Sequence, residues 1–299
     1  MRSLLGAIAL PAVLWASMGD AQVFDYGKYP DLHGQWVRWG PSGADLKGPL
    51  VRNGPPGFNP TRFDPSKPPG LAQRPPLTPE YEAMFEANMK DQREGGQGAT
   101  PTFTCLSPGM PRATNGYGEY EFVVTPGTTH VLVQHINDYR RIFTDGRDFP
   151  ANLEPSFMGY SIGRWVDAKG SGRYDLLEVE TRGPFKSPRS FDSSGALLHA
   201  DGQTIVKERI YLDEASPDLL HNDVTVIDHA LTRPWTVHKT YGREPEAQPV
   251  WAEINCGESN NHIKIGNEGY MLSADGYLMP AKKDQPPPDL RYFKQVQKK

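Results

Sequence analysis

The sequence predicts a mainly β protein built on a closed antiparallel barrel of about eight to ten strands, with one helix on its N-terminal side. From about residue 120 onward, short runs rich in Val, Ile, Tyr and Thr are separated by Gly, Asp, Asn and Pro, which is the pattern of strands and turns. The connections hold about 3 to 20 residues and no helical pattern, so consecutive strands are expected to pair antiparallel. The sequence contains no internal repeat of fixed period, which argues against a propeller.

The N-terminal residues predict export. Arg2 precedes an apolar run from Leu4 to Trp15, and small residues follow up to Ala21, as in a secretory signal peptide over residues 1–21. We expect cleavage near Ala21 and a mature protein that is periplasmic or secreted. The apolar run is shorter than the roughly 20 residues of a membrane-spanning helix, and we therefore expect no stable membrane insertion.

The mature chain is expected to have three parts. The first, 22–110, opens with an alternating strand pattern from His33 to Trp39 and continues with a long segment from Gly48 to Pro76, where repeated proline forbids a helix. We expect this proline-rich segment to wrap over the barrel. The barrel core is expected over 111–260, and residues 261–299 form a C-terminal extension.

One helix is predicted directly after the proline-rich segment. Thr78 is placed as its N-cap and Pro79 at its first position, and the double glycine at 95–96 ends it. Three apolar residues at helical spacing predict its buried face: Met84, Phe85 and Met89.

Eight further strands are predicted, each rich in β-branched or aromatic residues and bounded by turn residues. We expect them at about Tyr120–Thr125, His130–Ile136, Arg140–Thr144, Gly159–Val166, Asp175–Arg182, Thr204–Leu212, Leu220–Asp228 and Trp235–Tyr241.

The two cysteines, Cys105 and Cys256, are far apart in a chain that is expected to be exported. This favours one long-range disulfide over a metal site or a catalytic thiol.

The net charge of -4, without a run of Lys or Arg, argues against nucleic acid as a partner and against an anionic-membrane patch. Eight histidines without close metal spacing, and no phosphate-binding or dinucleotide motif, predict neither a metal nor a cofactor.

A dense charge cluster lies in one predicted hairpin. The strand before Asn137-Asp138 is expected to return as Tyr139–Thr144, so that Arg140 and Arg141 lie on opposite faces. One of them must face the buried interior, where a guanidinium needs carboxylate or carbonyl partners. We expect four residues to anchor a ligand through polar contacts: Arg140, Arg141, Asp145 and Arg147. Trp165 and Trp235 are expected to line the interior with aromatic faces, and the alternative is plain core packing.

Six short motifs follow one another in order: Cys105-Leu-Ser-Pro-Gly-Met-Pro-Arg112, Tyr139-Arg-Arg-Ile-Phe-Thr-Asp-Gly-Arg147, Gly159-Tyr-Ser-Ile-Gly-Arg-Trp165, Glu208-Arg209, Thr232-Arg-Pro-Trp235 and Glu253-Ile-Asn-Cys256. Together they resemble a large group of uncharacterised exported bacterial proteins that are described as lipocalin-like. The resemblance implies a lipocalin-like barrel and a bridge between the two cysteines, and it brings no settled activity. In such barrels an arginine can clasp a tryptophan of the first strand, and Trp36 with Arg140 or Arg209 resembles that arrangement.

Three segments depart from this group. The segment from Val166 to Glu180 forms a longer hairpin than members carry after the tryptophan. His199-Ala200-Asp201-Gly202 stands where members carry a Pro-His-Ser turn, and Asp228-His229 stands where they carry Asp-Pro. The Gly-x-Ser-x-Gly letters from Gly159 to Gly163 match a nucleophile motif. They lie in a strand pattern with no helix after it, and we interpret them as close-packed strand residues.

Imidazole and carboxylate groups gather on the last predicted strands. His221 and Asp223 share one face of a strand, Asp228 and His229 lie at its end, and His238 lies on the next strand. An imidazole beside a carboxylate is the arrangement of a general base near neutral pH. His221, Asp228, His229 and His238 are therefore the candidate catalytic residues, and the alternative is a polar outer face of a hairpin.

Barrels of about eight to ten strands have room for one small ligand. We expect an exported protein that binds a small hydrophobic or aromatic molecule. Cofactor-independent acid–base catalysis, as in a lyase, isomerase or hydrolase, is favoured over simple carriage because titratable residues fall at strand ends. The alternatives are a non-catalytic carrier and an envelope scaffold protein whose proline-rich segment meets a partner protein.

Overall fold

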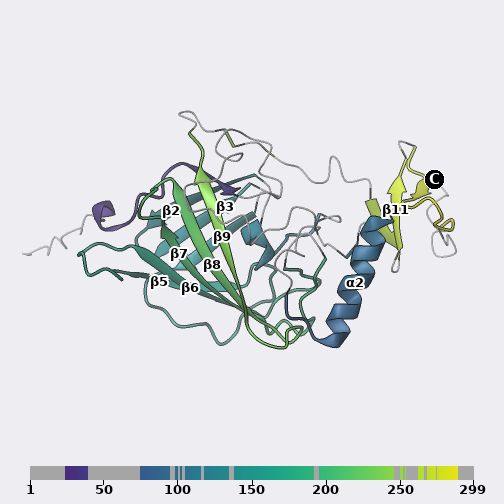
Figure 1. Cartoon of the computed structure of the whole chain (residues 1–299), viewed down its shortest axis with the longest axis horizontal. Coiled ribbons are helices and arrows are strands. Elements are labelled where there is room, and N and C mark those ends of the chain that lie inside the picture. The colour runs from purple at the N-terminus through teal and green to yellow at the C-terminus, as the bar shows by residue number, and fades with distance from the viewer. Residues whose placement is uncertain are drawn as a thin grey trace, which may run out of the picture.

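In the described part of the chain, nine strands close into a barrel, as the sequence predicts (Figure 1). The computed structural model describes residues 24–39, 75–94, 98–99, 102, 105–115, 118–134, 138–191, 195–245, 250–251, 253, 262–265, 268–273 and 275–288. The barrel strands are β1 (Gln35–Trp39), β2 (Glu119–Thr125), β3 (Thr128–Val133), β4 (Asp138–Phe143), β5 (Tyr160–Val166), β6 (Leu176–Arg182), β7 (Ile205–Leu212), β8 (Leu219–Ile227) and β9 (Trp235–Arg243). They follow sequence order around the barrel, and β9 pairs with β1 to close it.

One strand pair departs from the expected antiparallel arrangement. β4 and β5 run parallel, through the pairs Ile142 with Ser161 and Phe143 with Ile162. Nine strands cannot close with antiparallel pairs alone, because strict alternation would make the first and last strands parallel. The parallel pair restores an antiparallel closure between β1 and β9. The connection over residues 144–159 must therefore return along the barrel, and the all-antiparallel prediction is wrong at this pair.

The predicted helix is present as α2 (Pro79–Arg93), at one end of the barrel (Figure 1). Pro79 opens it, and the backbone N–H of Thr78 donates to the carbonyl of Ala230 at 2.9 Å, which ties the helix start to the β8–β9 connection. Its buried residues lie four apart on one face: Tyr81, Phe85 and Met89. Met84 was expected on this face but is 39% exposed, so Tyr81 takes that place.

Two apolar clusters fill the barrel and its end. The cluster on the α2 side includes Tyr81, Phe85, Met110, Phe185, Phe191 and Val224. The other cluster includes Trp36, Tyr120, Ile142, Leu177, Leu220 and Tyr241. Buried and more exposed residues alternate along β3, where the buried residues are Thr129, Val131 and Val133.

A tryptophan clasp is present, but its arginine differs from the expected ones. Trp36 is 0% exposed, and the guanidinium of Arg243 lies 4.3 Å from the centre of its ring. Arg243 also donates to the backbone carbonyl of Asp31 at 2.9 Å, which holds the segment before β1 against the end of β9. Arg140 lies inside the barrel and Arg209 is exposed, so neither of the two expected partners makes the clasp.

The C-terminal extension contains a small antiparallel sheet that the sequence did not predict. It consists of β10 (His262–Ile265), β11 (Glu268–Leu272) and β12 (Leu278–Pro280). The sheet lies beside the C-terminal half of α2 (Figure 1), where Lys282 forms an ion pair with Asp91.

Several predictions fall on residues outside the described part. These are the signal peptide over 1–21, nearly all of the proline-rich segment, the turn residue Asn137, and Cys256. The bridge from Cys105 to Cys256 therefore stays a prediction. Of the helices in the described residues, none combines the length and the apolar character needed to span a membrane.

Candidate functional site

The charge cluster of β4 is divided between the interior and the surface. Arg140 is 6% exposed and points into the barrel, whereas Arg141 is exposed and lies over the ring of Tyr139. This follows from the alternation of side chains along a strand. The prediction that one of the two arginines faces the interior is confirmed.

Arg140 is held by three side chains from three successive strands. Its Nε donates to Ser161 Oγ on β5 at 2.9 Å, and its terminal nitrogen donates to Thr181 Oγ1 on β6 at 2.6 Å. The same nitrogen lies 2.5 Å from an oxygen of Glu208 on β7, whose side chain is 1% exposed. A charged group deep in a barrel needs such a partner, because an unpaired buried charge is strongly unfavourable.

A second residue completes this buried layer. The side-chain amide of Asn222 on β8 donates to the other oxygen of Glu208 at 2.9 Å. The amide oxygen of Asn222 is buried and has no hydrogen-bond partner among the described residues. The nearby hydroxyl of Tyr241 cannot supply one, because it donates its proton to the carbonyl of Thr114 at 2.6 Å. We call Arg140, Ser161, Thr181, Glu208 and Asn222 the interior polar layer.

A cavity of about 30 Å³ lies against this layer. Arg140, Glu208 and Asn222 form its charged and polar wall. The rest of the lining is mainly apolar and aromatic, and includes Met110, Ala113, Tyr120, Phe122, Met158 and Tyr241. Burial raises the pKa of Tyr241 well above its usual value, so this phenol stays neutral. The cavity therefore has a mainly apolar lining, a wall formed by the paired charges of Arg140 and Glu208, and one unpaired acceptor, the amide oxygen of Asn222.

In the turn after β4, the charged side chains of Asp145 and Arg147 pair with each other. The Nε of Arg147 donates to both carboxylate oxygens of Asp145, at 2.9 and 3.0 Å, and its guanidinium lies 4.0 Å from the ring centre of Phe143. The hydrogen bonds from Arg147 lower the pKa of Asp145 to about 2. Both charged side chains are exposed, and neither lines the cavity.

The two predicted aromatic ligand residues also lie away from the cavity lining. The indole N–H of Trp165 donates to Thr129 Oγ1 at 3.1 Å, and its ring meets Tyr29 edge-on. Trp235 meets Phe191 edge-on at the α2 side. Both are partly buried and pack against the apolar clusters, which fits the alternative of core packing.

Two predicted catalytic histidines point outward. His221 Nε2 lies 3.0 Å from Asp213, and His238 Nδ1 lies 2.6 Å from Asp223. Their rings are 4.9 Å apart on the outer face of β8 and β9. We call these the outer histidine pairs, and they lie on the opposite side of the barrel wall from Asn222.

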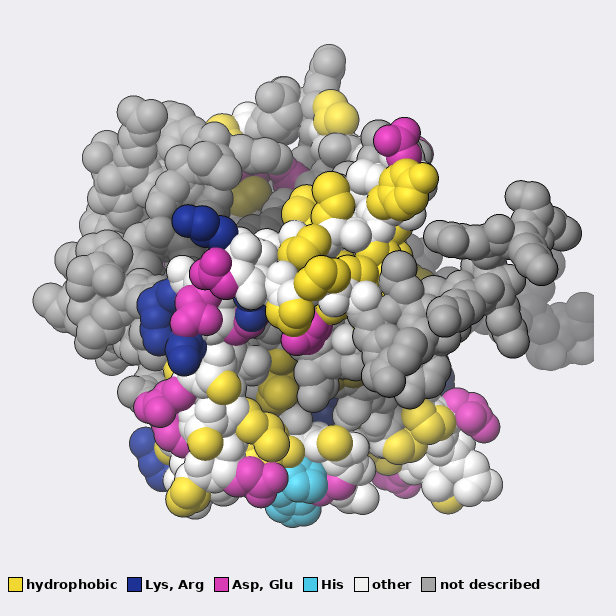
Figure 2. Space-filling model, turned by 90° about the vertical axis from the view of Figure 1, so that its right-hand side faces the viewer, with side chains coloured by type: hydrophobic (Ala, Val, Ile, Leu, Met, Phe, Trp, Pro, Cys, Tyr) yellow, Lys and Arg dark blue, Asp and Glu magenta, His cyan; other side chains and the backbone are white. Residues whose placement is uncertain are grey.

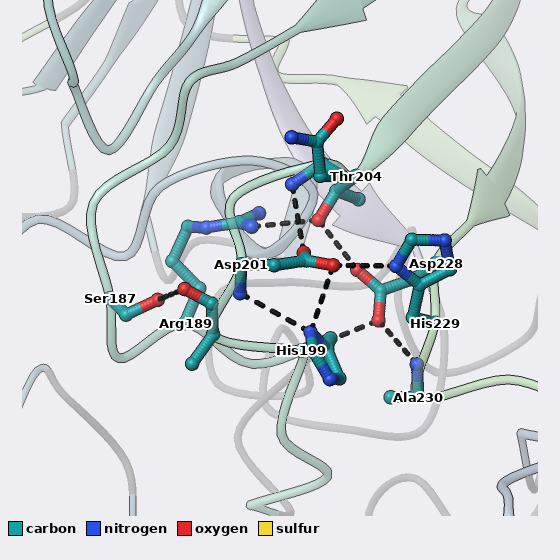
Figure 3. A network of polar contacts seen from close by, with 10 residues as sticks. Ser187, Arg189, His199, Asp201, Thr204, Asp228, His229 and Ala230 are labelled. Atoms are coloured by element: carbon teal, nitrogen blue, oxygen red, sulfur yellow. Dashed lines mark hydrogen bonds and ion pairs between the residues drawn. The ribbon is translucent and has the colours of Figure 1, made fainter.

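The other two predicted residues, Asp228 and His229, lie in the β8–β9 connection, which accepts the hydrogen bond from Thr78 at the start of α2. Figure 3 shows their surroundings. There His229, from the β8–β9 connection, meets His199 and Asp201, from the β6–β7 connection. His229 Nδ1 lies 2.5 Å, and His199 Nδ1 3.0 Å, from the same oxygen of Asp201. The three possible ligand atoms all lie within 4.8 Å of one another. We call His199, Asp201 and His229 the barrel-end cluster.

Asp228 is buried behind the barrel-end cluster and holds its two loops together (Figure 3). One of its oxygens accepts the backbone N–H of His199 at 2.9 Å and that of Ala230 at 2.8 Å. The other accepts the hydroxyl of Thr204 at 2.6 Å. Asp228 therefore fixes the backbone on both sides of the cluster without itself reaching the surface.

A buried arginine supports this carboxylate from behind. Arg189 is 1% exposed, and it donates to Thr204 Oγ1 at 2.7 Å and to the carbonyl of Met110 at 2.8 Å. Burial lowers the pKa of Arg189 to about 10, although the charges of Asp228 and Asp201 oppose this shift. The guanidinium lies over the ring of Phe185, which closes the network against the apolar core.

The contacts within the barrel-end cluster favour a negative charge on Asp201 and a positive charge on His229. Desolvation opposes ionisation of Asp201, but the backbone N–H of Gln203 and the imidazoles of His229 and His199 hold its pKa below the ordinary value. The hydrogen bond to Asp201 in turn raises the pKa of His229. On the α2 side of the molecule, histidine and acidic side chains gather at the lower edge of the surface, below a hydrophobic region (Figure 2).

Sequence reasoning missed six residues of these two sites: His199, Asp201, Ser161, Thr181, Glu208 and Asn222. A usable signal existed for His199 and Asp201. They directly precede β7, and Asp228 and His229 directly follow β8, its antiparallel neighbour, so both groups lie at the same end of the strand pair. Glu208 and Asn222 occupy inward positions between apolar residues, where a polar side chain is unusual. Aligning the ends of neighbouring predicted strands would have indicated the barrel-end cluster. Comparing their inward positions would have indicated the interior polar layer.

No family model matches this chain, and no curated protein or solved structure matches it. The interior polar layer and the barrel-end cluster are therefore interpreted from their own geometry.

Proposed function

We propose that this chain is an exported barrel protein that binds a small apolar or aromatic molecule inside the barrel, through one hydrogen bond to the amide oxygen of Asn222. The observation that carries the proposal is this unpaired acceptor on the wall of a cavity whose lining, apart from the paired Arg140 and Glu208, is mainly apolar. A buried acceptor without a partner costs about 1–3 kcal/mol, and a ligand hydroxyl or N–H would remove that cost. The N-terminal signal pattern and the lipocalin-like resemblance support export and ligand binding.

The size of the cavity limits the ligand. At about 30 Å³ it holds a water molecule as it stands, whereas sites for larger ligands span about 300–1,000 Å³. Two methionines, Met110 and Met158, lie in the lining. Methionine side chains are flexible and repack readily, so they are the residues expected to move when a single aromatic ring enters. A phenol is the simplest molecule with the required shape and donor.

Binding of phenol tests this proposal. We expect calorimetry or protein-observed NMR to show saturable binding by the wild-type protein, and binding at least about tenfold weaker in Asn222→Leu, which removes the acceptor. Ala113→Leu fills the cavity but leaves the interior polar layer intact, and it should weaken binding at least as much as Asn222→Leu does. Asp223→Asn, at the neighbouring outward position, is the matched control and should bind as the wild type does.

Two results would reject the interior site and leave a water molecule as its occupant. The first is that phenol does not bind the wild-type protein saturably. The second is that Asn222→Leu and Ala113→Leu bind phenol as tightly as the wild type does. The protein for this experiment is best prepared by export from a bacterial host. The intact mass of the exported protein would then also test the predicted cleavage, because it should correspond to a chain that begins near Gln22.

Acid–base catalysis by a lyase, isomerase or hydrolase is a second candidate function. The observation that favours it is the 2.5 Å contact between His229 and Asp201, at a surface where a substrate can approach. With an activated aryl ester as the probe of hydrolysis, His229→Ala and Asp228→Asn are each expected to abolish turnover while the protein stays folded. His238→Ala, on the outer face, should keep the wild-type rate. Full activity in both barrel-end variants would remove this candidate, and binding without turnover would identify a carrier.

A further inference from the structure

We propose that the barrel-end cluster binds one divalent transition-metal ion, and that Zn²⁺ is the ion it fits best. His199 and His229 would each provide Nδ1, and Asp201 would provide one carboxylate oxygen. This site lies outside the cavity at the interior polar layer, so the proposal goes beyond small-molecule binding and does not depend on it.

The donor set is the one that zinc prefers. Two imidazole nitrogens and one carboxylate are typical of zinc sites with three protein ligands, in which the fourth position is open to water or substrate. Bond lengths of about 2.0–2.1 Å around a tetrahedral ion place neighbouring ligand atoms about 3.3 Å apart. The separations of 2.5 Å from Asp201 to His229 and 3.0 Å from Asp201 to His199 are both shorter than that value, so a small outward shift of these ligand atoms would admit the ion.

Two imidazole nitrogens converge on one carboxylate oxygen. His199 Nδ1 lies 3.0 Å from the oxygen of Asp201 that His229 Nδ1 also faces. An ion between these three atoms would replace the two contacts with coordination bonds, and each ligand nitrogen would release any proton that it carries.

The surroundings hold the three ligands in place. One oxygen of Asp201 accepts the backbone N–H of Gln203 at 2.9 Å, which directs the other oxygen toward the two imidazoles. Asp228 fixes the backbone of both ligand loops through His199 and Ala230. Hydrogen-bonded groups behind the ligands in this way are characteristic of metal sites, and they raise affinity by fixing ligand orientation. Asp228 is therefore a positioning residue of this site.

The site is also open to an ion from solvent. The side chain of His229 is 69% exposed, and those of His199 and Asp201 are partly exposed. Replacing an exposed histidine leaves the core untouched, so variants at His229 are expected to fold. Because the ligands come from two connections, a bound ion would link the β6–β7 and β8–β9 loops.

Titration of the metal-free protein with ZnCl₂ tests the proposal, with a chromophoric chelator as competitor. We expect one Zn²⁺ per chain, and affinity more than about 100-fold weaker in each of three variants: His199→Ala, Asp201→Asn and His229→Ala. Asp228→Asn should weaken binding by about 10- to 100-fold, as expected for a group that acts through the ligands. Excess Ca²⁺ should not displace the ion, because calcium prefers a shell of oxygen ligands.

His221→Ala and His238→Ala are the matched controls, since the outer histidine pairs also combine imidazole and carboxylate at the surface. Both should bind one Zn²⁺ as the wild type does. Co²⁺ provides a spectroscopic readout: its visible absorption should appear with the wild type and with His238→Ala, and should be lost with His229→Ala. Thermal unfolding of each variant confirms that it is folded.

Two results would overturn the proposal. The first is a wild-type protein that binds no stoichiometric Zn²⁺. The second is a similar loss of affinity in the outer-face and barrel-end variants, which would mean that zinc coordinates surface histidines without a defined site.

Discussion

Replacing Arg140 by methionine is expected to lower the free energy of unfolding by about 3–5 kcal/mol, the usual cost of removing one partner of a buried ion pair. The reason is the carboxylate that remains. Glu208 is 1% exposed, and without the guanidinium the amide of Asn222 is the one side-chain donor that remains to it among the residues that the structure describes. Urea unfolding, followed by fluorescence and circular dichroism, measures the change.

Arg141→Met provides the matched control, because it removes the same charge from the adjacent position of the same strand. Arg141 is exposed, and substitutions at such positions usually change stability by no more than about 0.5 kcal/mol. Equal losses in the two variants would contradict the assignment of Arg140 to the interior.

A double variant separates the ion pair from simple packing. Arg140→Met combined with Glu208→Gln removes both charges, and the glutamine side-chain oxygen can still accept the hydrogen bond from Asn222. This variant should be more stable than Arg140→Met alone, since no unpaired charge remains in the core. A double variant that is less stable than either single variant would show that packing, and not charge, sets the cost.

Replacing Trp36 by alanine is expected to cost about 3–5 kcal/mol, as is typical for the loss of a large buried aromatic side chain. Trp36 is 0% exposed, and its indole N–H donates to the carbonyl of Leu32 at 3.1 Å. The substitution empties the centre of the apolar cluster at this end of the barrel and also removes the surface on which Arg243 stacks. Thermal and urea unfolding would measure the loss.

The clasp itself is tested by Arg243→Lys, which keeps the charge but loses the planar guanidinium. We expect a loss of about 1–2 kcal/mol, because lysine cannot stack on the indole and at the same time donate to the backbone carbonyls of Asp31, His33 and Pro217, as Arg243 does. Arg209→Lys is the control at the position that the sequence offered as an alternative partner, and it should leave stability unchanged. A larger effect at Arg209 than at Arg243 would contradict the assigned clasp.

Most of the barrel could be predicted because a half-buried strand leaves a period of two in the sequence. The strand predicted at about Leu220–Asp228, for example, is Leu219–Ile227 in the structure. Strand direction leaves no such trace. The connection over residues 144–159 is long enough to serve either a parallel or an antiparallel neighbour, so the parallel pairing of β4 with β5 could not be predicted from pattern alone.

The candidate sites could be predicted only in part, for a related reason. Alternation indicated that Arg140 and Arg141 face opposite sides, but not which of them faces inward, because polar residues occur on both faces of β4. His221 and His238 were placed on strands correctly, yet the side they face depends on how the barrel closes. His229 meets Asp201 from 28 residues away, a contact that requires the pairing of β7 with β8 to be known.

The parallel junction has a consequence for how the barrel can open. β4 and β5 are joined by two residue pairs, whereas β5 and β6 are joined by seven, so the ring of backbone hydrogen bonds is shortest at this point. The side chain of Arg140 crosses this junction, reaching from β4 to Ser161 on β5 and on to Glu208 on β7. Side-chain contacts thus reinforce the ring where the backbone supports it least. Parting of β4 from β5 would require Arg140 to release its partners, which couples local unfolding of this seam to the buried ion pair.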